Sequence, residues 1–296
     1  MTVPGSVIEW LAAQGHGQIT DTRPVAGGCI NNAAILRTAT GQSFFLKENA
    51  SAPEAMFARE AEGLQALAVG GGPRVPSPLL VGADFLLMED LRSGPPEPAY
   101  WEAFGHQLAG LHDHTGDQFG FERDNFLGST PQPNPPTQDG FEFFANQRLG
   151  YQARLANSRG LLGSDELARI LMLAARLREW VPQQPASLIH GDLWSGNAIT
   201  GSNGEPAIID PAAHYGWAEA ELGMTALFGG FSERFYRAYE EARPLESGWQ
   251  ERLPIYNLYH LLNHVNLFGT SYLGQVRNIL KRFAPGPAVQ DSRGGR

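Results

Sequence analysis

The sequence predicts an α+β fold with two lobes, a small β-rich lobe followed by a larger helical one. Residues 18–47 form short apolar and polar alternating runs separated by turn residues, a pattern typical of β-strands. From Trp101 onward the apolar spacing is mostly helical. A Pro/Gly-rich stretch, 92–100, separates the two patterns. We therefore expect a first lobe at 1–91, a second at 92–283 and a disordered tail at 284–296.

Each lobe can be divided further by its turn and helix-end signals. The first lobe is expected to contain a helix from after Ser6 to Gly15, strands within 18–47 with a turn at Gly41, a helix over 53–68 and strands within 75–90. The second is expected to contain helices over 101–115, 142–156 and 165–181, a proline-rich loop over 129–140, short strands around 188–212 and two further helical stretches after them.

Composition limits the classes of function. The 296 residues are 42% hydrophobic and carry a net charge of −9, with no basic run, which argues against nucleic-acid or membrane-surface binding. No apolar run is long enough to span a membrane, and the first residues lack the pattern of a signal peptide. The single cysteine, Cys29, cannot form an internal disulfide. We expect a cytoplasmic, monomeric protein.

The stretch LIHGDLWSGNAI (188–199) holds the main candidates for chemistry. Asp192 and Asn197 lie five residues apart, and Asp210 ends the next strand-like run, so a hairpin can return it beside Asn197. Asn197 and Asp210 could then share a hard cation such as Mg²⁺, and Asp192 could accept a hydroxyl proton. Asp and Asn also stabilise ordinary turns, which is the better interpretation of any one of them alone. The three together favour phosphoryl transfer.

Lysine is rare in this chain, with Lys47 and Lys281 against 20 arginines. Lys47 ends a hydrophobic strand 13 residues before Glu60, which lies in a predicted helix. A carboxylate there could hold the ammonium group against nucleotide phosphates, although a strand-end lysine is more often simply solvated. Gly27 and Gly28, upstream of this strand, could let backbone N–H groups approach phosphates; alone they are weak evidence.

Other chemistries fit less well. His260 and His264 are four residues apart but lack the glutamate of a zinc-protease helix, so hydrogen bonding is favoured over zinc. His112 lies near a predicted helix end, where a histidine can complement the helix dipole. Ser195 is not in a G-x-S-x-G setting, and neither lysine is in a Walker A motif.

Together these motifs resemble the protein-kinase-like fold and, more narrowly, the fructosamine kinase (ketosamine-3-kinase) family. The narrower resemblance rests on longer stretches: HGDLWSGN, IIDPAAHYG, ELGMTALFGGF and LYHLLNHVNLFG, with GGCINNA, DNFLGSTPQPN and FFANQRL upstream. It covers about Ile19 to Tyr272. It implies that residues 1–91 form a nucleotide-binding lobe, and residues 92–283 a catalytic and substrate lobe.

The resemblance also implies roles. Asp192 resembles the catalytic base and His190 the residue that braces its loop. Asn197 and Asp210 resemble the Mg²⁺ ligands, and Lys47 with Glu60 the ion pair that binds ATP phosphates. The inter-lobe segment that binds adenine is represented by Met88, Glu89 and Asp90. The family phosphorylates the 3-hydroxyl of ketosamines, free or on glycated proteins, and the unstable product decomposes to release the amine.

Two alternatives stay open beside a ketosamine kinase. One is a kinase of another small hydroxylated metabolite, such as an aminoglycoside or choline; the other is a nucleotide-binding pseudokinase. Retention of the charged motif residues argues against the pseudokinase. The chain departs from the family pattern at Trp217-Ala218 and at Gly140-Phe141. Both departures could alter the sugar or amine side of the substrate pocket.

Cys29 stands in the glycine-containing loop. It could be a small packing residue. Alternatively, the positive potential of a phosphate site would stabilise its thiolate, so that oxidation inhibits the enzyme reversibly. Because there is no second cysteine in the chain, a disulfide could form only with another molecule, for instance by linking two copies through Cys29.

Overall fold

A computed structural model describes residues 2–25, 31–91 and 94–285. The glycines expected to approach phosphates, Gly27 and Gly28, lie outside these ranges, as does Cys29. Two residues of the expected linker, 92–93, and nearly all of the expected tail, 286–296, also lie outside them. Within the described residues, no helix has the length and apolar character needed to cross a membrane.

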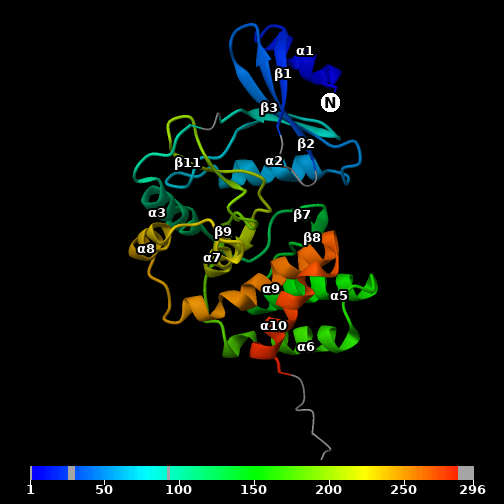
Figure 1. Cartoon of the computed structure of the whole chain (residues 1–296), viewed down its shortest axis with the longest axis vertical. Helices are drawn as coiled ribbons and strands as arrows, with labels where there is room; N and C mark the ends of the chain where they lie inside the picture. Colours follow the sequence, from blue (N-terminus) through cyan, green and yellow to red (C-terminus); the bar gives the residue numbers. More distant parts are fainter. Residues whose placement is uncertain (1, 26–30, 92–93, 286–296) are drawn as a thin grey trace, which may run out of the picture.

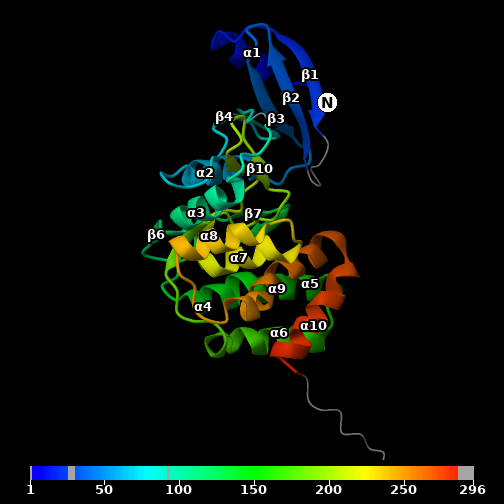
Figure 2. The same ribbon diagram turned by 60° about the vertical axis from the view of Figure 1, so that its left-hand side comes forward.

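The first lobe is an antiparallel sheet with a helix on each face (Figures 1 and 2). Among the described residues the strand order is β1-β2-β3-β5-β4. The elements are α1 (Gly5–Ala13), β1 (Ile19–Val25), β2 (Asn32–Thr38), β3 (Ser43–Glu48), α2 (Met56–Leu67), β4 (Pro78–Val81) and β5 (Phe85–Glu89). The helices and strands predicted here are confirmed, with ends that differ by a few residues.

The alternation along β5 explains why both helices dock. Phe85 and Leu87 pack with residues of α1, whereas Leu86 and Met88 face α2. Successive side chains of a strand point to opposite faces, so a strand that is apolar at every position can be covered on both sides. This sheet therefore holds two small cores, one under each helix.

The second lobe is mainly helical. Its helices are α3 (Tyr100–His112), α4 (Gly140–Phe143), α5 (Tyr151–Ser158), α6 (Ser164–Ala175), α7 (Ala218–Leu227), α8 (Glu233–Ala242), α9 (Trp249–Phe268) and α10 (Leu273–Phe283). Short 3₁₀ segments follow α6 at Leu177–Glu179 and precede α10 at Thr270–Tyr272. The nearly all-buried α9 lies at the centre of the main core (Figure 2).

Two expectations for this lobe need correction. In place of two helical stretches after residue 212, the described chain up to residue 285 has four helices. Glycines with positive φ separate them, such as Gly248 before α9 (φ 76°) and Gly269 after it (φ 88°), because an L side chain resists that conformation. The helix expected over 142–156 is continuous but widens to a π-helix at Phe144–Gly150.

Short strands within this lobe build the region around residues 188–216. They are β6 (Thr115–Gly116), β7 (Asn125–Leu127), β8 (Thr130–Gln132), β9 (Ala186–Ile189), β10 (Ala198–Thr200), β11 (Pro206–Ile208) and β12 (His214–Gly216). β9 pairs with β12 and β6, and β10 pairs with β11. In the hairpin β7–β8, strand β8 lies in the stretch expected to be a proline-rich loop, and β7 lies in residues before it that were assigned no element. Strands β7 and β8 are each too short to show a clear alternation of apolar and polar residues in the sequence.

The lobes meet where α2 packs on the segment that follows β11. A Cβ built on Gly63 of α2 would lie 3.3 Å from Cγ of Pro211 and 3.4 Å from Cβ of Ala213. Glycine therefore brings the α2 backbone close to this segment. As a result, Glu60, one turn earlier on α2, lies near residue 210 of the other lobe.

Candidate functional site

The loop over residues 190–197 connects β9 to β10. It starts directly after the buried strand β9, and Leu193 within it is fully buried, which anchors the loop to the core. The amide of Trp194 donates to the carbonyl of Asp192 at 3.0 Å, and that of Asn197 to the carbonyl of Trp194 at 3.0 Å. These two turns return the chain, so that Asp192 and Asn197 lie side by side.

Only glycine fits at position 191 of this loop. Its φ is 82°, and a Cβ built on it would lie 2.2 Å from the carbonyl oxygen of Ala212. The 190–197 loop and the segment after Asp210 therefore touch through backbone alone. The amide of Ala212 also donates to the carbonyl of His190 at 2.9 Å, which fixes the two segments together.

His190 is a brace in this structure. Its Nδ1 accepts from the amide of Asp192 at 3.2 Å, and its Nε2 lies 2.8 Å from the carbonyl oxygen of Ile209. This pattern requires a neutral ring with its proton on Nε2. Burial lowers the pKa of His190, which agrees with a neutral ring. The bracing role implied by the sequence fits this geometry, and both ring nitrogens are engaged away from any substrate.

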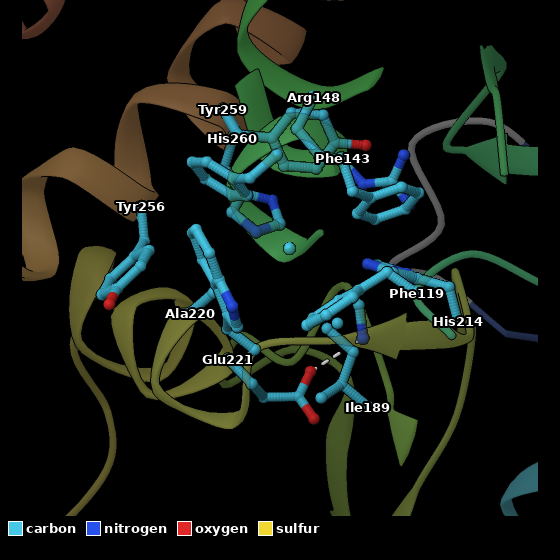
Figure 3. A pocket seen from close by; sticks show the side chains of 15 residues that line it. Phe119, Phe143, Arg148, Ile189, His214, Ala220, Glu221, Tyr256, Tyr259 and His260 are labelled. Carbon is cyan, nitrogen blue, oxygen red and sulfur yellow. Dashed lines mark hydrogen bonds between the residues drawn. The ribbon is translucent and has the colours of Figure 1, made fainter. Parts of the chain in front are cut away.

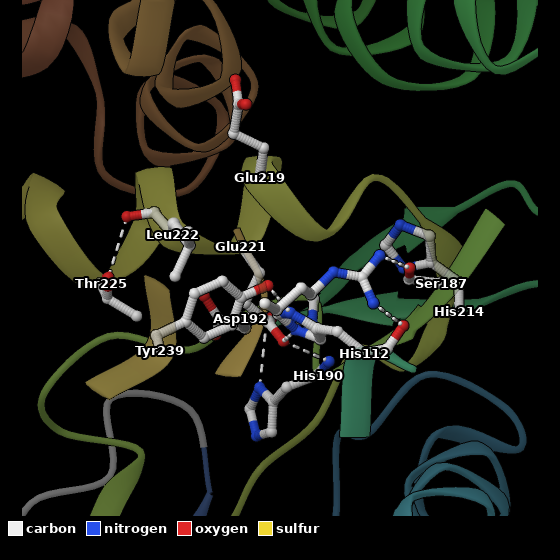
Figure 4. A network of polar contacts seen from close by, with 12 residues as sticks. His112, Ser187, His190, Asp192, His214, Glu219, Glu221, Leu222, Thr225 and Tyr239 are labelled. Atoms are coloured by element: carbon white, nitrogen blue, oxygen red, sulfur yellow. Dashed lines mark hydrogen bonds and ion pairs between the residues drawn. The ribbon is translucent and has the colours of Figure 1, made fainter. Parts of the chain in front are cut away.

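Glu221, on α7, holds the backbone of the 190–197 loop (Figure 4). Its carboxylate accepts from the amides of His190 at 2.8 Å and Gly191 at 2.7 Å, and lies 3.1 Å from Nε2 of His112. Burial would raise the pKa of Glu221, but the hydrogen bonds from His112 and from the backbone amide of His190 hold it below its usual value. The loop backbone is thus tied to one ionised, buried carboxylate.

His112 was expected to complement a helix dipole, and the structure corrects this. The side chain is fully buried, and burial lowers its pKa, so the ring is neutral. Its Nδ1 lies 2.7 Å from the hydroxyl of Tyr239. With its other nitrogen on Glu221, His112 supports the loop from α3. Sequence reasoning missed this role and that of Glu221. Glu221 begins the quoted stretch ELGMTALFGGF, but a residue that supports loop backbone has no spacing signal of its own.

Asp192 has one carboxylate oxygen near each of two neutral groups. Its Oδ2 is 3.3 Å from Nδ2 of Asn197, which also donates to the Asp192 carbonyl at 2.8 Å. Its Oδ1 is 4.0 Å from Nδ1 of His260. The side chain keeps 22% of its surface accessible. Burial, together with the charges of Asp210 and Glu221, raises the pKa of Asp192 well above its usual range. A carboxylate of raised pKa suits proton acceptance.

The β10–β11 hairpin brings Asp210 beside Asn197, as the sequence predicted. The amide of Ile209 donates to the carbonyl of Asn197 at 3.0 Å, and Asp210 follows immediately. Asp210 has a φ of 60°, an uncommon conformation for a residue other than glycine. Its side chain is 42% exposed, whereas Asn197 is buried. The described residues hold no cluster of three or more His, Cys, Asp or Glu side chains with metal-binding geometry.

The lysine cluster, defined as Lys47, Glu60 and Asp210, joins the two lobes. The Lys47 ammonium lies 2.5 Å from Oε1 of Glu60 and forms a second ion pair with Asp210. Burial opposes the charge of Lys47, but the two carboxylates outweigh it and raise its pKa. The predicted pairing with Glu60 is confirmed as a contact; the bond to Asp210 was not anticipated.

The side chains of the segment expected to bind adenine contact other parts of the protein. Met88 is buried in the core under α2. The Glu89 carboxylate forms an ion pair with Arg74, and the Asp90 carboxylate accepts from the Ser43 hydroxyl at 2.5 Å. These three side chains therefore have structural partners. Any contact of this segment with a base would have to come from its backbone.

An aromatic surface flanks the 190–197 loop and was not recognised from the sequence. We define it as Trp194, Phe228, His264 and Phe268. Adjacent ring centroids are 6.3, 5.1 and 5.5 Å apart in that order. The Trp194, Phe228 and Phe268 side chains are large and exposed. His264 donates from Nδ1–H to the carbonyl of His260 on its own helix at 2.8 Å, which fits hydrogen bonding better than zinc.

The two departures from the family pattern lie together. Trp217 is buried, with ring centroids 5.2 Å from both Phe141 and Phe144. A Cβ on Gly140 would lie 2.6 Å from Nε1 of Trp217, so the missing side chain makes room for the indole. Gly140, Phe144 and Trp217 line a buried space behind the 190–197 loop (Figure 3).

Comparisons with known proteins agree on one family. A sequence model described as fructosamine kinase matches residues 6–284. A Synechocystis sp. protein assigned as a ketoamine kinase is 42% identical over 94% of this chain and 96% of its own length. A chloroplastic protein-ribulosamine 3-kinase of Arabidopsis thaliana is also 42% identical, over 92% of this chain and 85% of its own.

Solved structures extend the likeness to the fold. A Thermobifida fusca structure assigned as a fructosamine-3-kinase has a TM-score of 0.85 and 33% identity, covering 95% of this chain and all of that one. The aminoglycoside phosphotransferase APH(4)-Ia has a TM-score of 0.61 at 17% identity, covering 94% of this chain and 99% of its own, which shows a shared fold alone. The predicted bilobal, protein-kinase-like α+β fold is confirmed.

Proposed function

The chain belongs to the fructosamine kinase family, and we propose that it transfers the γ-phosphoryl group of ATP to the 3-hydroxyl of a ketosamine. The observation that carries the proposal is the junction of the lobes. Lys47 and Glu60 of one lobe meet Asp210 of the other, next to the loop that presents Asp192 and Asn197. Phosphoryl transfer needs mainly positioning and charge neutralisation, which these groups can supply.

The first lobe would bind the nucleotide. Lys47, held by Glu60, would contact the ATP phosphates, with Gly27 and Gly28 as proposed backbone donors upstream. The segment Met88–Asp90 would meet the adenine through its backbone. In this proposal residues 1–91 are the nucleotide lobe and 92–283 the catalytic and substrate lobe. The ion pair of Lys47 with Asp210 would loosen as phosphate oxygens replace one carboxylate.

Asn197 and Asp210 fit a magnesium site. Mg²⁺ takes oxygen ligands, keeps several waters and needs only one or two protein carboxylates besides phosphate oxygens. Asp210 offers a partly exposed carboxylate, and the Asn197 amide nitrogen is already used by Asp192, which leaves its oxygen for the ion. A bound Mg²⁺ would neutralise charge on the phosphates. The amide keeps its hold on Asp192 at the same time.

Asp192 would act as the base. As the 3-hydroxyl oxygen forms its bond to the γ-phosphorus, its proton passes to the Asp192 carboxylate, and the bond to the bridging oxygen breaks to release ADP. The raised pKa of Asp192 favours this uptake. His190 and Glu221 hold the backbone of the loop, so the carboxylate stays in place during the transfer.

The aromatic surface would receive the acceptor. Trp194 follows Asp192 by two residues, so a sugar stacked on its indole would lie near the base. The exposure of Trp194, Phe228 and Phe268 leaves room for an amine carried by a larger molecule. We propose ribulosamine- or fructosamine-type ketosamines as substrates, either free or on glycated proteins. Release of the amine would follow from decay of the 3-phosphate.

A substrate panel tests this function. ADP release would be measured with ribulosyl- and fructosyl-lysine, a glycated protein, the free sugars, choline and an aminoglycoside, with Asp192→Asn as the blank. We expect turnover with ketosamines well above all the others. A faster reaction with choline or the aminoglycoside would show that the acceptor is that compound class and not a ketosamine. Absence of ATP turnover with every acceptor, despite ATP binding, would support the pseudokinase.

A further inference from the structure

His260 is the one unexplained polar side chain next to the proposed base. It lies on α9 and is almost wholly buried, with 8% of its side chain exposed. Its Nδ1 has no hydrogen-bond partner among the described residues. Its Nδ1 lies 4.0 Å from Oδ1 of Asp192, too far for a direct hydrogen bond. Buried ring nitrogens without a partner are uncommon, so the atom calls for an explanation.

The surroundings narrow the choice of partner. His260 lines a small cavity behind the 190–197 loop, and its ring enters from α9 opposite Ile189 and Glu221 (Figure 3). Two other buried unpartnered atoms, Nε of Arg148 and Nε1 of Trp217, belong to residues that line the same cavity. Both are N–H donors and can accept nothing. The Asp192 carboxylate, by contrast, is an acceptor, and its Oδ1 lies 4.0 Å from Nδ1 of His260.

The next histidine on the helix shows a contrast. Nδ1 of His264, one turn later, is satisfied by the carbonyl of His260. Nδ1 of His260 makes no such bond to its own helix, so it is left facing the loop. Burial, with the charges of His264 and Arg148, lowers the pKa of His260 to about 3, and the ring is neutral. A neutral ring still has one N–H to donate.

We propose that His260 is a positioning residue that donates from Nδ1–H to Oδ1 of Asp192 in the reacting complex. A small rotation of the carboxylate, or one water molecule, closes the 4.0 Å gap. Asn197 then holds the Oδ2 side and His260 the Oδ1 side, so the carboxylate cannot turn away from the acceptor hydroxyl. This inference rests on the proposed role of Asp192 as base.

Two conservative variants of His260 test which of its ring nitrogens is required. Asn carries an amide N–H near the position of Nδ1, whereas Gln carries it near that of Nε2. We expect His260→Asn to keep kcat within about threefold of wild type, and His260→Gln to lose roughly 10- to 100-fold, part of the full contribution of a general base. KM for ATP should be unchanged in both variants, since His260 lies away from the lysine cluster. Rescue by Gln in place of Asn would overturn the assignment to Nδ1.

A double-mutant cycle tests whether His260 works through Asp192. His260→Phe keeps a ring and removes the donor, and we expect the same 10- to 100-fold loss of kcat as for Gln. In an Asp192→Asn background the same change should cost less than threefold, because the group it positions is gone. An equal loss in both backgrounds would show a structural role and overturn the inference. If Asp192→Asn itself stays active, the proposed base fails first, and the inference with it. Should His260→Phe not fold, the Asn and Gln pair decides.

Discussion

The lysine cluster and the 190–197 loop are neighbours that are held by opposite kinds of interaction. The cluster consists of charged side chains from α2, β3 and the end of the β10–β11 hairpin, paired directly with each other. The loop is held by two backbone amides that, together with the neutral ring of His112, converge on the single carboxylate of Glu221. Ion pairs can exchange one partner for a phosphate, whereas buried amide bonds cannot be exchanged without loss. The comparison suggests that the cluster is built to exchange and the loop to stay fixed.

The largest effect should come from the loop. Asp192→Asn is nearly isosteric, so folding and ATP binding should be retained, while turnover should fall by about 10²- to 10⁴-fold, as is typical for loss of a general base. Single-turnover rates with a ketosamine, alongside ATP titration by calorimetry, would measure both. A rate within a few-fold of wild type would remove Asp192 from the role and leave the loop without a chemical function.

A substitution in the lysine cluster should weaken ATP binding rather than the chemical step. Asp210→Asn keeps a residue that tolerates positive φ but removes the carboxylate. We expect Mg²⁺-dependent ATP affinity to fall by about 100-fold or more, because loss of a ligand should cost more than the roughly 10- to 100-fold typical for residues that only support a ligand. Calorimetric titration with and without Mg²⁺ is the measurement. Unchanged Mg²⁺ dependence would place the metal elsewhere.

Coupling inside the cluster gives a smaller effect. Lys47→Met and Glu60→Ala should each lower kcat/KM by about 10- to 100-fold, the value of a hydrogen bond to a charged group. The double variant should be little worse than either single one, because the two residues act as a unit. Additive losses would mean that the contact seen between them does not serve nucleotide binding.

The anchor of the loop should show mainly in stability. Glu221→Gln replaces an ionised acceptor of two amides by a neutral group that can accept through only one oxygen. We expect a cost of about 3 kcal/mol, or a fall of roughly 5–10 °C in Tm for a chain of this size, with KM for ATP unchanged. Differential scanning calorimetry would test this. A Glu221→Gln variant that is stable but binds ATP weakly would contradict the view that Glu221 supports the loop while the lysine cluster binds the nucleotide.

The smallest effect should be a dependence of stability on pH. Burial lowers the pKa of five histidines: His112, His190, His214, His260 and His264. In the unfolded chain they bind protons near pH 6.5, so stability is full above that value and declines as pH falls. The raised pKa values of Asp192 and Glu60 act in the opposite sense, but they are two groups against five. Tm should be lower at pH 5.5 than at pH 7.5; an equal or higher Tm would contradict this.

Sequence reasoning predicted contacts between side chains of the lysine cluster, and it missed contacts that hold the backbone of the 190–197 loop. Lys47 with Glu60, and Asn197 with Asp210, were predicted because charged and amide side chains at motif spacings carry a chemical meaning. Glu221 was missed because it accepts backbone amides, which have no residue-specific signature, and because a glutamate in a helix is usually solvated.

The fold shows a similar limit. Long runs with a clear period were predicted correctly in type, including α2, α3 and the five-stranded sheet among the described residues. The paired strands β7 and β8 have three residues each, too few for periodicity, and the breaks around α9 depend on glycine conformation. The aromatic surface comes from segments far apart in the chain, so only the structure could assemble it.

The close packing of Gly63 against Pro211 has a consequence for regulation. In protein kinases the helix that carries the glutamate partner of the lysine can swing outward, and this movement is an on–off switch. Here the α2 backbone lies against the segment that follows Asp210, and Lys47 links Glu60 to Asp210 as well. A swing of α2 would have to move that segment as well. We therefore expect an enzyme that is always switched on, with its flux set by the supply of glycated substrate.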